Sequence, residues 1–133
     1  MELNPYLLFD GNCEKAFKFY EQHLGGKIET ITKHGGSPME KHVPAEWRHK
    51  VMHARMTIAG NVLMGSDPPP DRYQPPQGIS VSINVKDAAE ADRIFEALSK
   101  NGRVSMPIQK TFWATRFAML TDRFGIPWMI NCE

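Results

Sequence analysis

The chain repeats one pattern at an offset of 75 residues, and this internal repeat limits its possible folds more than any other feature. Segments 12–26 and 87–102 each begin with a helix-capping residue, continue with apolar residues at helical spacing and end at glycine. The offset aligns Phe95 with Tyr20, and each segment follows an apolar, strand-like run. Two unrelated amphipathic helices would also resemble each other, so that simpler interpretation stays open. An architectural repeat predicts two similar half-sheets that enclose a pocket.

The other apolar patterns give each half the order βαβββ. Strand patterns lie at 5–9, 27–32, 51–58 and 62–64 in the first half, and at 79–85, 103–106, 111–122 and 126–131 in the second. Pro127, inside the last pattern, predicts an edge strand or a bulge, because proline cannot donate a ladder hydrogen bond. The polar segment 33–50 predicts a long loop, in which Trp47 could act as a lid residue.

We therefore predict an α+β fold of two βαβββ modules, with the helices on one face of a curved mixed sheet and a cleft on the other. The length of 133 residues fits a single domain over 1–133. Within it, modules 1–67 and 78–133 are joined by a proline-rich bridge at 68–77, which cannot form a helix or a central strand.

Composition excludes several classes of protein. The net charge is +1 with scattered Lys and Arg, so no basic stripe indicates nucleic-acid binding. No run approaches the roughly 20 apolar residues that span a bilayer, and no signal-peptide pattern is present. Cys13 and Cys132 show no zinc-site spacing with histidine. We expect a cytoplasmic protein in which both thiols are reduced.

The strand at 51–58 carries the most reactive candidate pair. His53 and Arg55 lie two residues apart and therefore share one face of the strand. Arg55 could bind a carboxylate or phosphate with two hydrogen bonds, and His53 could exchange a proton near neutral pH. A solvated face, or an ion pair between Arg55 and an acidic neighbour, would explain the same pattern.

Further candidates lie in the second half. Ser82 and Asn84 alternate along one strand and could orient a ligand, or they could line a solvated face or a dimer contact. Trp113 and Trp128 suit a cleft wall, although a core or interface position fits them equally. The remaining histidines, His23, His34, His42 and His49, are expected at the surface. No nucleophile elbow or phosphate-binding loop is present.

Two C-terminal segments resemble a known family. Residues 106–114 (MPIQKTFWA) and 121–131 (TDRFGIPWMIN), together with the start at 5–13, resemble the PhnB-like branch of the vicinal-oxygen-chelate superfamily. That superfamily includes glyoxalases, extradiol dioxygenases and drug-resistance proteins. The resemblance covers nearly the whole chain, and it implies the paired βαβββ fold and a homodimer.

The same resemblance implies where metal ligands would lie in metal-dependent members. The corresponding positions here are Asn4 or Tyr6, Met64, Ser80 and Met129. None of them supplies an imidazole or a carboxylate, and thioethers and hydroxyls are poor ligands for hard divalent ions. We therefore expect no metal and no other cofactor.

These observations predict a small homodimer that holds a small organic molecule in its cleft and binds neither nucleic acid nor membranes. The residues expected to line the cleft are Tyr6, His53, Arg55, Ser82, Asn84, Trp113 and Trp128. The first alternative is a metal-dependent lyase, isomerase or dioxygenase-like enzyme of the same superfamily, with His53 as general base. The second is a dimeric interaction module. Members of this branch have also been described as ubiquinone-pathway methyltransferases. We do not expect that activity, because the chain lacks the glycine-rich loop of a nucleotide-binding fold.

Overall fold

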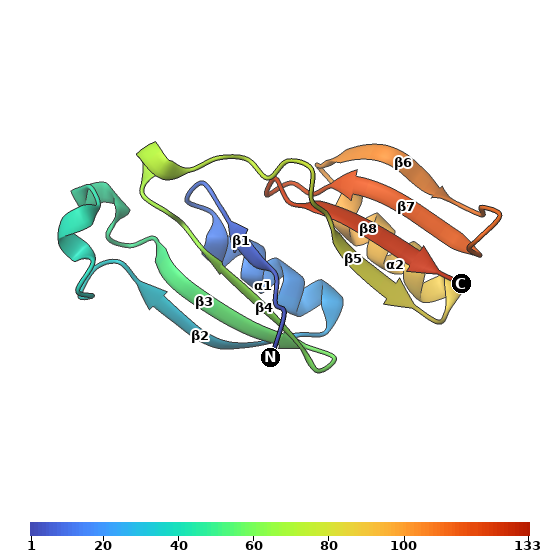
Figure 1. Ribbon diagram of the computed structural model, residues 1–133, viewed down its shortest axis with the longest axis horizontal. Helices are drawn as coiled ribbons and strands as arrows, with labels where there is room; N and C mark the ends of the chain where they lie inside the picture. Colours follow the sequence, from blue (N-terminus) through green and yellow to red (C-terminus); the bar gives the residue numbers. More distant parts are fainter. The chain divides into compact units, whose positions relative to one another are not determined.

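The computed structural model describes residues 1–133 and divides into two compact units, Met1–Pro75 and Pro76–Glu133. Each unit has the order strand, helix, three strands (Figure 1). Unit 1 contains β1 (Tyr6–Leu8), α1 (Cys13–Leu24), β2 (Lys27–Lys33), β3 (Val51–Ile58) and β4 (Asn61–Ser66). Unit 2 contains β5 (Val81–Val85), α2 (Ala88–Ser99), β6 (Arg103–Gln109), β7 (Arg116–Thr121) and β8 (Pro127–Cys132). The predicted α+β fold with two βαβββ repeats is confirmed.

The repeat offset is present in the structure itself. Helices α1 and α2 each contain 12 residues, and their first residues, Cys13 and Ala88, lie 75 positions apart. Each helix has an apolar stripe that buries one helix face on a sheet. The division between the units falls within the bridge at 68–77, where η3 (Pro70–Arg72) forms a single short 3-10 turn.

The two sheets have the same topology. Their strand orders are β1-β4-β3-β2 and β5-β8-β7-β6, and in each sheet the first strand pairs in parallel with the last one along the chain. Strand β8 therefore lies between β5 and β7, and the predicted edge strand or bulge at Pro127 is wrong. Pro127 is the first residue of β8, a position where a missing backbone N–H costs no ladder hydrogen bond.

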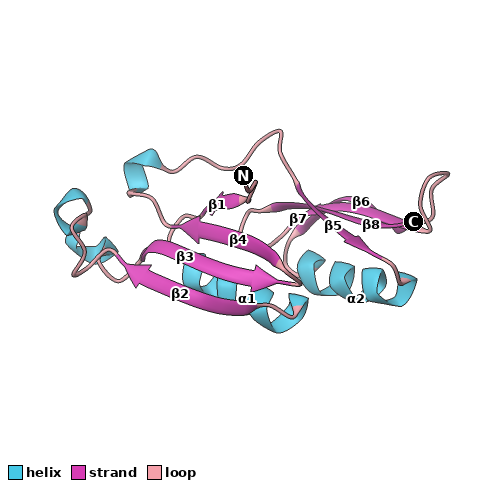
Figure 2. Ribbon diagram, turned by 60° about the horizontal axis from the view of Figure 1, so that its bottom comes forward, coloured by secondary structure: helices cyan, strands magenta, loops and turns pink.

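Each helix covers one face of the sheet in its own unit (Figure 2). Helix α1 packs on β3 and β2, and its Phe17 and Tyr20 are fully buried. At Gly65 in β4 a Cβ atom would lie 2.9 Å from the Phe17 ring, so only glycine allows this close approach. In unit 2, α2 packs on β7 and β8 and buries Ala91, Ile94 and Leu98.

The two helices begin differently. Asn12 was expected to cap α1, but its side chain makes no capping hydrogen bond. The buried carboxylate of Asp67 occupies that role, because its Oδ1 accepts hydrogen bonds from the backbone N–H groups of Gly11 and Cys13 at 2.9 and 3.1 Å. Asp87 caps α2 as expected, since its Oδ1 accepts from the N–H of Ala89.

Segment 33–50 was expected to be a long loop. In the structure it contains two short 3-10 turns, η1 (Glu40–His42) and η2 (Ala45–Trp47). Both cysteines are buried free thiols. None of the helices has the length and apolar character needed to cross a membrane.

Candidate functional site

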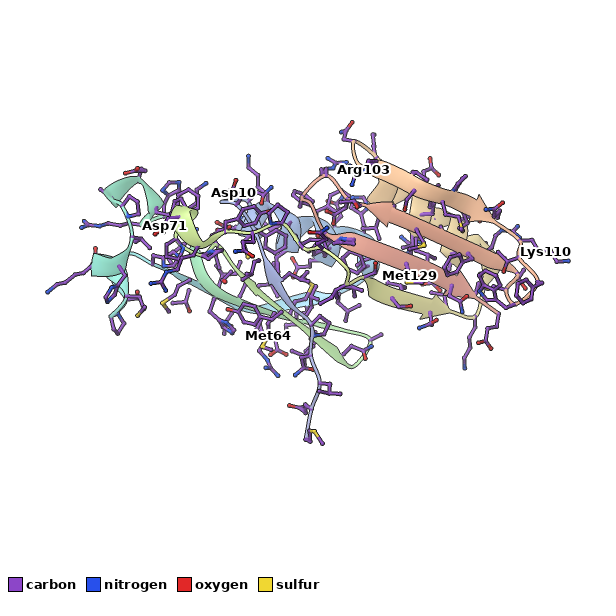
Figure 3. The ribbon with its side chains drawn as sticks, turned by 45° about the horizontal axis from the view of Figure 1, so that its top comes forward. Asp10, Met64, Asp71, Arg103, Lys110 and Met129 are labelled. Atoms are coloured by element: carbon purple, nitrogen blue, oxygen red, sulfur yellow. The ribbon has the colours of Figure 1, made fainter.

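Three neighbouring side chains lie on the face of the unit 1 sheet that points away from α1. In the strand register Tyr6 lies opposite Met64, and Met64 lies opposite Arg55. Their chain neighbours Leu7 and Leu63 are buried. Because side chains alternate between the two faces of a strand, Tyr6, Met64 and Arg55 share the uncovered face. Figure 3 labels Met64 in this unit.

His53 joins this face through its contact with Tyr6. The Tyr6 hydroxyl lies 3.4 Å from His53 Nδ1, and the two ring centroids are 5.8 Å apart. The hydroxyl can donate to Nδ1 of a neutral imidazole, and the second ring nitrogen, Nε2, then carries the N–H. Tyr6 therefore orients the His53 ring, although the two residues are 47 positions apart in the sequence.

Arg55 makes the ion pair that the sequence left open as an alternative. Its Nε lies 3.3 Å from Glu29 Oε2, and both side chains remain well exposed. An exposed pair of this kind contributes little to stability. A ligand carboxylate or phosphate can therefore replace Glu29 as the partner of Arg55 at a low cost in free energy. The guanidinium can then donate two parallel hydrogen bonds to the ligand.

The uncovered face of the second sheet carries Ser82 and Asn84 beside apolar Met129. Ser82 lies opposite Met129, and Asn84 lies opposite Asn131, whose Nδ2 donates to Asn84 Oδ1 at 3.3 Å. Ser82 and Asn84 are exposed, as their predicted positions on a polar face require. Of these residues, Met129 is labelled in Figure 3.

Trp128 lies away from these polar groups. Its side chain is 2% exposed, and its Nε1 donates to the carboxylate of Asp122 at 2.8 Å. In β8 the buried residues are Trp128, Ile130 and Cys132, whereas Met129 occupies the alternate face. We therefore place Trp128 in the core of unit 2, the alternative that the sequence left open, and not in the ligand-binding set.

Trp113 lies in the loop between β6 and β7. It is 48% exposed and stacks edge-on between Phe112 and Phe117, with centroid distances of 4.8 and 5.3 Å. Phe112 is 98% exposed. These two adjacent rings present an apolar tip that unit 2 does not cover.

Comparisons with known proteins agree with this geometry. The family model described as the Glyoxalase/Bleomycin resistance protein/Dioxygenase superfamily matches residues 2–130. The chain belongs to this superfamily. The protein YjdN from Escherichia coli (strain K12) is 36% identical over 139 residues, which cover 98% of this chain and 95% of YjdN.

Two solved structures show the same fold. The crystal structure of protein PA1353 from Pseudomonas aeruginosa matches with a TM-score of 0.91 and 48% identity, over 100% of this chain and 98% of that one. A PhnB protein from Bacillus cereus matches with a TM-score of 0.84 and 21% identity over the full length of both chains. The expected membership is confirmed, and the PhnB protein shares the fold.

The superfamily implies a divalent metal in some members, and the donor groups here do not fit one. Tyr6 and Met64 are register partners, and so are Ser82 and Met129. Ser80, near which the resemblance implies a ligand position, directly precedes β5. Neither pair, a phenol with a thioether or a hydroxyl with a thioether, supplies good ligands for a hard divalent ion. No group of three or more His, Cys, Asp or Glu side chains has the geometry to hold a metal ion.

Two polar residues that the sequence did not indicate are buried in unit 1. His34 was expected at the surface but is 5% exposed, and Asp67 is 1% exposed. His34 Nε2 lies 2.7 Å from the carbonyl oxygen of Asp67. The partners are 33 residues apart, so no local pattern could have shown the contact.

Proposed function

We propose that this superfamily member binds a small organic acid on the uncovered face of the β1-β4-β3 sheet without a metal ion. The observation that carries the proposal is the convergence of Tyr6, His53 and Arg55 from two strands on one face. Arg55 would bind the acid group by exchanging it for Glu29, and the Tyr6 and His53 rings would contact the rest of the molecule. The protein would act in the cytoplasm as a homodimer, and Ser82, Asn84 and Trp113 would contribute ligand contacts within unit 2.

A lyase or isomerase activity is the second candidate, and the Tyr6–His53 contact favours it. The hydroxyl at 3.4 Å fixes the imidazole and leaves its other nitrogen for proton exchange with a bound molecule. An interaction module is the third candidate, supported by the exposed Phe112 and Trp113. We do not propose the methyltransferase activity in the name of the Bacillus cereus PhnB protein, because a nucleotide-binding loop is absent from the sequence.

Binding of benzoate and phenylphosphonate, measured by thermal shift and isothermal titration calorimetry, tests the first candidate. We expect R55A to weaken binding by about tenfold or more, since a charged hydrogen bond is lost. The matched control is R116A, which removes a similarly exposed ion pair, Arg116–Asp92 at 3.0 Å, from unit 2. Equal binding by wild type and R55A would refute the Arg55 role.

The metal-free part of the proposal needs its own measurement. Elemental analysis of protein purified without a chelating column should find less than stoichiometric zinc, nickel, iron or manganese. Ligand affinity should be the same before and after dialysis against EDTA. One tightly held ion per chain, with affinity that depends on it, would overturn the proposal in favour of a metal-dependent enzyme.

A further inference from the structure

A cavity of about 490 Å³ lies within unit 1, away from the sheet face described above. The loop that follows β2 forms one wall, and residues 66–72 form the other. Figure 3 labels Asp71 on this second wall. None of the residues predicted from the sequence as site residues lines it, and its volume is that of a typical small-molecule pocket.

The buried residue His34 lines this cavity. A carbonyl oxygen only accepts, so His34 Nε2 must donate its proton to the Asp67 carbonyl at 2.7 Å. In the neutral ring Nδ1 is then an acceptor, and it is buried with no partner. An unsatisfied buried acceptor is unfavourable. A bound molecule with a hydroxyl or amino group would satisfy it.

Arg72 lies at the exposed rim of the same cavity. Its guanidinium has no ion-pair or hydrogen-bond partner in the structure, unlike Arg55 and Arg116, which each contact a carboxylate. A free guanidinium suits a carboxylate or phosphate. Met39, Met52 and Pro69 also line the cavity, and their apolar surface can cover a short carbon frame.

Hydrogen bonds hold both walls in place. Trp47 Nε1 donates to the carbonyl of Pro68 at 3.0 Å, so the predicted lid residue ties the loop to the opposite wall. The backbone N–H groups of His34 and Gly35 donate to Lys50 and Arg48 at 3.0 and 2.8 Å. A cavity whose walls are already fixed loses little entropy when a ligand binds.

We propose that this cavity binds a small carboxylic acid that also carries a hydroxyl group. The carboxylate is held by Arg72 at the rim, and the hydroxyl donates to His34 Nδ1 inside. This site is independent of the proposed function, because it shares no residue with the sheet face.

Matched pairs of acids that differ by one hydroxyl test the proposal. The pairs are malate and succinate, lactate and propionate, and 4-hydroxyphenylacetate and phenylacetate, each titrated into the full chain by calorimetry. We expect at least one hydroxylated acid to bind about tenfold or more tightly than its partner, since only it satisfies the buried nitrogen. If no hydroxy acid binds, or if no pair shows a preference, the proposal is wrong.

Nuclear magnetic resonance of the imidazole nitrogens identifies the site. The preferred acid should shift the His34 Nδ1 resonance, whereas a shift at His53 alone would assign binding to the sheet face and overturn the cavity proposal. This readout does not require a His34 variant, which could fail to fold.

Charge variants supply the second arm. R72Q should weaken binding of the preferred acid by about tenfold. The control is K41Q, which removes a charge from the neighbouring loop at a residue outside the cavity lining. Equal loss in both variants would indicate a general charge effect and would refute the Arg72 contact.

Discussion

Asp67 caps the N-terminus of α1 by accepting a hydrogen bond from the backbone N–H of Cys13 at 3.1 Å. The same carboxylate accepts from Gly11 at 2.9 Å and, through its other oxygen, from the first residue of β3, Val51, at 2.9 Å. One side chain at the end of β4 therefore fixes the start of a helix and the start of a neighbouring strand.

Replacement of this carboxylate should destabilise the protein. D67N places an amide N–H₂ group against a backbone N–H that needs an acceptor, so one buried donor loses its partner. We expect the free energy of unfolding, measured by urea denaturation, to fall by about 1–3 kcal/mol. D71N is the matched control, because Asp71 is exposed and makes no hydrogen bond in the structure. A similar loss in both variants would contradict the capping role.

The Cys13 thiol should make stability depend on alkaline pH. Burial, and then the neighbouring Asp67 carboxylate, raise the pKa of Cys13 far above its usual range. The unfolded chain loses this proton near pH 8.5 and the native state retains it, so stability falls as pH rises, by roughly 1.4 kcal/mol per pH unit from this group. Urea denaturation from pH 7 to pH 10 should therefore show a steeper loss for wild type than for C13A. Parallel curves would contradict this prediction.

Glu14 should contribute to stability with the opposite pH dependence. Hydrogen bonds from Lys33 and then Lys18 lower the pKa of the Glu14 carboxyl. A lowered pKa means that the contribution is present above the unfolded value of about 4.3 and is lost as pH falls through the folded value. Because the group is partly exposed, E14Q should cost less than about 1 kcal/mol at pH 7.

That difference should shrink as pH falls below about 4.3 and through the lowered pKa of the folded state, as measured by thermal unfolding of wild type and E14Q. The control is E96Q, which removes the charge of an exposed glutamate on α2. Glu96 has no ion-pair partner, so E96Q should be as stable as wild type at neutral and at acid pH. An E14Q cost that persists at acid pH would indicate a packing effect instead.

Trp128 should matter for folding. W128F removes the indole N–H from the buried carboxylate of Asp122 and leaves a small void, so the free energy of unfolding should fall by about 2–4 kcal/mol. W113F changes a half-exposed ring that makes no hydrogen bond, and it should cost less than about 0.5 kcal/mol. Chemical denaturation monitored by circular dichroism gives both values, and a larger cost for W113F would reverse our placement of the two residues.

The local patterns of the sequence predicted the elements well, except that the strand predicted at 111–122 starts only at Arg116, because residues 111–115 form a loop. Helices α1 and α2 each have an apolar stripe, which depends on residues within a few helical turns. Strands β3 and β5 alternate between two kinds of side chain, which depends only on residues within the strand. The same alternation placed His53 and Arg55 on one face of β3. It could not reveal that Tyr6 contacts His53, since that contact depends on the pairing of β1 with β4.

By itself, the sequence determined where the helices and strands form and which side chains share a face, because these properties depend on near neighbours in the chain. The tertiary structure alone decided that β8 is a central strand, that Asp67 rather than Asn12 caps α1, that His34 is buried, and that Arg55 pairs with Glu29. These outcomes join residues separated by 26 to 54 positions, or strands that pair out of chain order. Such contacts depend on how the strands pair and how the sheet packs on its helix, and no periodic pattern in the sequence indicates them.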